Sequence, residues 1–100
     1  MSAAPLSLPD TLTMATAAQA LRALEPALPG GALAQVDAAA LRDFDTAALA
    51  VLLQLRRGAQ AAGGDLRIAN PPPALAELAQ LYGVDAALPG LEPQAAAAAA

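Results

Sequence analysis

The chain of 100 residues contains no cysteine, no histidine and no lysine, and its five basic residues are all arginines. Without cysteine there can be no disulfide, thiol nucleophile or thiolate metal site. Without histidine there is no imidazole base, Ser-His-Asp triad or His-ligated zinc, and without lysine there is no Schiff base. Acid–base chemistry would rest on carboxylates alone, so the composition favours a protein that binds over one that catalyses.

Aromatic side chains and positive charge are also scarce. Phe44 and Tyr82 are the only aromatics, so there is no platform on which nucleic-acid bases could stack. The net charge of −4 would repel the negatively charged phosphate backbone of a nucleic acid. The longest apolar run before the tail, Ala47–Leu53, is far shorter than the roughly 18 residues that a membrane-spanning helix needs. The N-terminus lacks the basic start of a secretory signal. We therefore expect a cytoplasmic protein with no nucleic-acid partner and no direct insertion into a membrane.

The length suits a single domain with one hydrophobic core. Of the apolar residues 31 are alanines, which bury little area, so the 18 leucines must carry most of the packing. We predict a domain over residues 5–89, followed by a low-complexity, alanine-rich and disordered tail over residues 90–100.

Turn residues divide the domain into short strands and helices. Helices are predicted over Thr16–Leu24, with Thr16 as the N-cap, over Thr46–Ala62, which Gly63-Gly64 ends, and over Ala74–Tyr82. Strands are predicted as a small edge pair, Leu6–Leu8 with Thr11–Met14 around Pro9-Asp10, and over Ala32–Val36, Leu41–Phe44 and Leu66–Ala69. This alternation predicts an α/β fold with a mixed four- to five-stranded sheet and helices packed mainly on one face.

The helix over Thr46–Ala62 carries more apolar surface than one sheet can cover. The face expected to meet the sheet comprises Ala48, Val51, Leu52, Leu55, Ala59 and Ala62. The first two turns, Ala47–Leu53, are nevertheless apolar all round. Either a neighbouring helix of the same domain covers Leu49 and Leu53, or these residues belong to a docking patch for another protein.

The docking patch would have an apolar centre rimmed by Gln54 and Arg57. Its predicted residues are Asp45, Thr46, Ala47, Leu49, Ala50, Leu53, Gln54 and Arg57. Small alanines there would permit close approach of a partner. The same patch would allow an isolated chain to form a homodimer.

Polar residues around this helix allow more than one interpretation. Thr46 serves either as a helix cap, a role that Asp45 can fill equally well, or as the site of a partner or a phosphate. Asp37 and Asp43 either end strands or form an acidic cluster with Asp45, but the spacing of these carboxylates specifies no metal site. A carboxylate-only enzyme built on these three aspartates would need a pocket and a raised pKa. The Arg56-Arg57 pair is interpreted as two solvated cations near the helix C-terminus.

Three stretches in a fixed order, Val36-Asp37, Phe44–Leu53 and Ala62–Pro71, resemble a STAS domain. They supply the Asp-Ser/Thr element, the helix that follows it, and a Gly-Gly-strand-Asn-Pro run. The resemblance covers about Leu6–Leu88. It implies a mixed sheet with helices on one side, no catalytic activity, no cofactor, and a protein partner bound around the start of the helix.

The STAS family includes bacterial anti-anti-sigma factors and the small accessory subunits of Mla-type phospholipid-transport ABC systems. The hydroxyl position of the family falls on Thr46, and Ala48 stands where anti-anti-sigma factors usually have glycine. The sequence Asp-Thr-Ala-Ala is closer to the accessory subunits. The resemblance therefore implies binding to the ATP-binding subunit of an ABC transporter, which would hold the protein at the inner membrane. The alternative is an anti-anti-sigma factor regulated by phosphorylation of Thr46.

Overall fold

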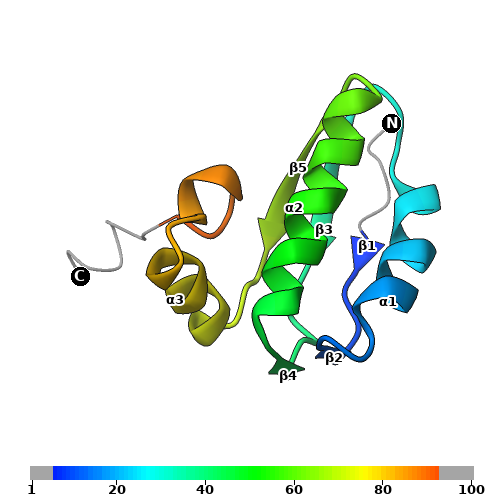
Figure 1. The fold of residues 1–100 in the computed structure, drawn as a ribbon. Coiled ribbons are helices and arrows are strands. Elements are labelled where there is room, and N and C mark those ends of the chain that lie inside the picture. Colours follow the sequence, from blue (N-terminus) through cyan, green and yellow to red (C-terminus); the bar gives the residue numbers. More distant parts are fainter. Residues whose placement is uncertain (1–5, 93–100) are drawn as a thin grey trace.

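The computed structural model describes residues 6–92 (Figure 1). Its strands are β1 (Leu6–Ser7), β2 (Thr11–Leu12), β3 (Leu33–Asp37), β4 (Asp43–Phe44) and β5 (Asp65–Ala69). Its helices are α1 (Ala17–Leu24), α2 (Thr46–Ala61) and α3 (Pro73–Leu81), with short 3-10 helices η1 (Glu25–Ala27) and η2 (Asp85–Ala87). The three predicted helices are confirmed to within one residue at each end. Within the described part, none of the helices combines the length and the apolar character that a transmembrane span requires.

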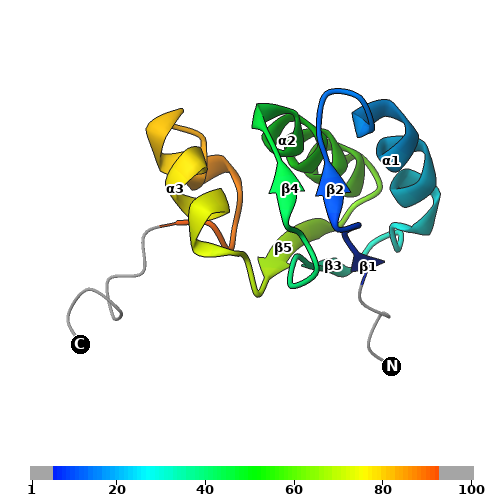
Figure 2. The ribbon, with the colours of Figure 1, turned by 90° about the horizontal axis from the view of Figure 1, so that it is seen from below.

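The strands form two small parallel sheets. β3 lies between β1 and β5 in a three-stranded sheet, and β2 pairs with β4 in a second sheet of two strands. α1 and α2 lie over the same side of the three-stranded sheet, as Figure 2 shows from below. The predicted α/β fold with helices on one face is confirmed. The prediction of one mixed sheet of four to five strands is corrected, because the larger sheet has three strands and all described pairs are parallel.

The predicted edge pair of Leu6–Leu8 with Thr11–Met14 does not form. β1 pairs with β3 and β2 pairs with β4, both in parallel. The stretch of chain that contains β1 and β2 therefore runs parallel to the stretch that contains β3 and β4, and each stretch is interrupted between its two strands. Residues 8–10 interrupt the first stretch and residues 38–42 the second. Pro9 lies in the shorter interruption and has no N–H to donate to a ladder. The turn signal at Pro9 therefore breaks a strand without reversing the chain.

The core is built by alternate residues of β3 and β5 and by one face of α2. The buried residues of β3 and β5 are Ala34, Val36, Leu66 and Ile68. α2 buries Ala47, Ala48, Leu49, Val51, Leu52, Leu55 and Ala59. Five of the six helix residues predicted to face the sheet are among them. The exception is Ala62, which follows the last residue of α2 and is exposed.

The free edge of β5 is covered by the segment that follows η2. The N–H of Ile68 donates to the carbonyl of Pro89 (2.8 Å), and the side chain of Leu91 is fully buried. Gly90 is also buried, so both residues belong to the packed part of the chain although the prediction placed them in the tail. The rest of the predicted tail, residues 93–100, lies outside the described residues.

An ion pair fastens α2 to β5 and η2. Arg56 Nε and Nη2 donate to the two carboxylate oxygens of Asp65 (2.8 and 3.3 Å), and Arg56 Nη1 donates to the carbonyl of Ala87 (2.9 Å). The interpretation of Arg56-Arg57 as two solvated cations is therefore wrong for Arg56. Arg57, one position further along the helix, is exposed.

This ion pair predicts a pH-dependent stability. Hydrogen bonds from Arg56, and a smaller contribution from the N–H of Leu66, hold the pKa of Asp65 below its usual value. A carboxylate with a lowered pKa stabilises the fold above its unfolded-state pKa and loses that contribution as the pH falls through the folded-state value. We expect Asp65→Asn to lower the Tm at about pH 7, and the difference from wild type to shrink below about pH 4. Thermal unfolding of wild type and Asp65→Asn across this pH range measures the difference in Tm, and a difference that does not change with pH would contradict the prediction.

Candidate functional site

The N-terminus of α2 is capped by Asp45. Its Oδ1 accepts a hydrogen bond from the N–H of Ala47 (2.8 Å), and its carbonyl accepts one from the N–H of Ala48 (3.0 Å). Of the two capping candidates in the sequence, Asp45 therefore takes the role. Thr46 occupies the first helical position and is exposed, so its side chain is accessible from outside the domain.

The same carboxylate also holds the turn that joins β2 to α1. Asp45 Oδ2 accepts a hydrogen bond from the N–H of Met14 (3.1 Å), 31 residues away in the sequence. Met14 is 78% exposed. The sequence predicted Met14 only as the last residue of a strand, because no local pattern signals a contact of this range.

The predicted docking patch divides into accessible and buried residues. Asp45, Thr46, Ala50 and Arg57 are exposed, and Leu53 and Gln54 are half-buried. Ala47 and Leu49 are only 8% and 4% exposed. Leu49 belongs to the same buried cluster as Leu75 and Ala79 of α3. The domain thus covers much of the excess apolar surface itself, and what remains accessible is a narrow strip from Thr46 to Arg57.

Shallow grooves run along both sides of this strip. Towards α1 lies a groove of about 350 Å³, lined by Ala17, Ala18, Leu21, Ala50, Val51 and Gln54. Towards η2 lies one of about 200 Å³, lined by Leu53, Arg56, Arg57, Gln60 and Ala87. The first is bordered mainly by small apolar side chains and the second by two guanidinium groups. The strip is therefore a shallow surface suited to contact with a protein, without the enclosed shape of a small-molecule site.

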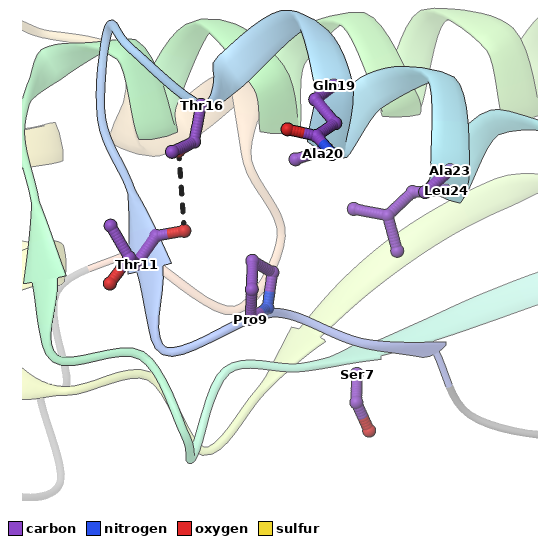
Figure 3. Close-up of a pocket in the computed structure, with 8 residues that line it drawn as sticks. All are labelled: Ser7, Pro9, Thr11, Thr16, Gln19, Ala20, Ala23 and Leu24. Atoms are coloured by element: carbon purple, nitrogen blue, oxygen red, sulfur yellow. Dashed lines mark hydrogen bonds between the residues drawn. The ribbon is translucent and has the colours of Figure 1, made fainter.

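A larger groove than these two, about 410 Å³, lies elsewhere, between α1 and the β1–β2 stretch (Figure 3). Its lining residues are Ser7, Pro9, Thr11, Thr16, Gln19, Ala20, Ala23 and Leu24. Across it, the hydroxyl of Thr16 donates to the carbonyl of Thr11 (3.4 Å) and accepts from the N–H of Thr13 (3.0 Å). Thr16 occupies the predicted N-cap position of α1, but its side chain closes the preceding turn and makes no capping hydrogen bond to the helix. Because none of the lining residues is ionisable, this groove offers no acid–base chemistry.

The three aspartates considered for catalysis are engaged in structural contacts or lie on the surface. Asp37 accepts hydrogen bonds from the N–H of Ala39 (2.9 Å) and from Asn70 Nδ2 (3.2 Å), which hold its pKa below the usual value. That direction is the opposite of what a general acid needs. Asp45 uses both oxygens to bind backbone N–H groups, and Asp43 is exposed at the start of β4. No group of three or more acidic residues within residues 6–92 is arranged to hold a metal ion.

The parallel α/β core, the aspartate cap and the exposed threonine at the start of α2 define a STAS-type domain. A family model described as "Mlab, STAS domain" matches residues 2–92, so the chain belongs to this family. The family is generally non-enzymatic. A comparison with curated proteins gave no match.

Proposed function

We propose that this STAS-domain protein is a non-enzymatic accessory subunit that binds and tunes the cytoplasmic ATP-binding subunit of a phospholipid-transport (Mla-type) ABC transporter. The observation that carries this proposal is the exposed Thr46 at the capped start of α2, in a chain of the Mlab STAS family. The protein would work in the cytoplasm, held at the inner membrane by its partner, without a cofactor.

The accessible strip has the composition of a protein contact. Thr46 and Ala50 are small, so a partner's backbone can approach closely, and the half-buried Leu53 supplies an apolar centre. Gln54 and Arg57 border it with groups that can pair with a polar rim. The two buried residues of the predicted patch, Ala47 and Leu49, are not accessible to a partner and are left out of the proposed contact.

Co-purification tests the proposal. The wild-type chain is co-expressed with the ATP-binding subunit of the Mla-type transporter from the same organism, and the complex is isolated through a tag on the ATPase. We expect a stable complex and an ATP hydrolysis rate that differs from that of the ATPase alone. Absence of the chain from the purified ATPase, together with an unchanged rate on its addition, would contradict the proposal.

An anti-anti-sigma factor is the second candidate, and the exposure of the Thr46 hydroxyl is the observation in its favour. Incubation with an anti-sigma kinase of the same organism and ATP, followed by intact mass, distinguishes the two functions. A phosphate on the wild type that is absent from Thr46→Ala would support the second candidate. Ala48, which fills the usual glycine position, is fully buried.

A homodimer through the same strip is the remaining alternative for the isolated chain. The accessible strip is small, so pairing would be weak. Dimer formation would also compete with the ATPase, because both would use Thr46 and Leu53. Sedimentation of the chain with and without the ATPase separates the two associations.

A further inference from the structure

Asp45 joins two segments that the sequence separates widely. One carboxylate oxygen accepts from Ala47 at the start of α2 (2.8 Å), and the other accepts from Met14 in the β2–α1 turn (3.1 Å). β2 pairs directly with β4, and Figure 2 shows the turn after β2 beside the start of α2. The turn is therefore held next to Thr46.

Met14 presents a large apolar side chain at this position. It is 78% exposed, although an unbranched apolar side chain of this size gains from burial. We propose that Met14 is an apolar anchor of the docking surface and inserts into an apolar pocket on the ATP-binding subunit. This inference rests on the proposed function, and it extends the contact from α2 to the β2–α1 turn.

The charges around Met14 indicate what surrounds that pocket. Asp10, Asp43 and Asp45 are all exposed on the paired segments that carry β2 and β4. Arg42 is the one cation among residues 10–14 and 42–46, so this end of the domain is acidic. Complementarity requires a partner pocket bordered by basic side chains.

Exposure alone does not single out Met14, because Leu81 on α3 is equally exposed at 78%. Leu81 is the last residue of α3, and Figures 1 and 2 show this helix and the β2–α1 turn on opposite sides of α2. The pair offers a matched comparison, in which both side chains are apolar and accessible but only Met14 is tied to the Thr46 surface.

The experiment compares Met14→Gln with Leu81→Gln. Binding of the full chain to the purified ATP-binding subunit is measured by isothermal titration calorimetry at about 0.1 M and about 0.5 M salt. We expect Met14→Gln to weaken binding about tenfold and Leu81→Gln to leave it unchanged, with both variants melting like wild type. Higher salt should weaken wild-type binding, because an acidic rim facing a basic one is screened.

The outcomes separate this inference from the proposed function. If wild type does not bind the ATPase at all, both fail. If wild type binds but Met14→Gln stays within about twofold of it, the anchor is overturned and the proposed function stands. Equal weakening by both variants would also overturn the anchor, and affinity that is insensitive to salt would overturn the basic border of the pocket.

Discussion

Replacing Thr46 with glutamate is expected to weaken binding to the ATP-binding subunit at least about a hundredfold, about 2.7 kcal/mol, without destabilising the domain. Thr46 is exposed at the first position of α2, where the accessible strip begins and next to the β2–α1 turn that Asp45 holds. A partner seated there would bury the new carboxylate without an opposite charge, and an unpaired buried charge is costly. In the free protein the same carboxylate lies at a helix N-terminus, where the dipole favours it.

Two variants control for this prediction. Thr46→Ser keeps the hydroxyl and removes one methyl group, so it should bind almost like wild type. Gln80→Glu adds the same charge at an exposed position of α3, outside the proposed contact, and should also bind normally. Titration calorimetry gives the affinities and thermal unfolding shows that the variants are folded. Wild-type affinity of Thr46→Glu would contradict docking through the start of α2.

The local elements could be predicted because their signals lie within short stretches of sequence. The apolar spacing from Ala48 to Ala59 fixes the buried face of α2, and Gly63, with a φ of +87°, ends the helix where the sequence indicated. The same kind of signal placed Thr46 at the start of the helix and left it open whether Thr46 or Asp45 caps it. In the structure, the hydrogen bond from the N–H of Ala47 to Asp45 Oδ1 identifies Asp45 as the cap.

Long-range contacts could not be predicted in this way. The partners of β1 and β2 depend on which stretches lie side by side, and Pro9 marks an interruption as readily as a turn. The bond from Met14 to Asp45 and the contact of Arg56 with Ala87 each join residues 31 apart. The patch residue Leu49 is likewise buried in a core cluster whose members come from elements far apart in the sequence. Sequence periodicity shows that a side chain is apolar, but it does not show which neighbour covers it.

The second large effect is expected at Gly90, in the segment that closes the edge of β5. Its φ is +106°, which an alanine adopts only under strain, and an added Cβ would meet the carbonyl oxygen of Ile68 at 2.1 Å. The chain would have to move away from β5 to relieve this clash. That movement would break the bond from Ile68 N–H to the carbonyl of Pro89 and uncover Leu91.

We therefore expect Gly90→Ala to reduce the free energy of unfolding by about 3–5 kcal/mol, measured by urea denaturation. Gly83→Ala is the matched control, because Gly83 also has a positive φ, +71°, but an added Cβ there would meet nothing within 4 Å. Gly83→Ala therefore introduces the backbone strain without the clash, and it should reduce the free energy of unfolding by about 1–2 kcal/mol. The difference between the two variants measures how much closure of the β5 edge contributes to stability. If both variants lost the same free energy of unfolding, the segment around Gly90 would be able to move away from β5 at no further cost, and residues 90–92 would contribute little to the stability of the domain.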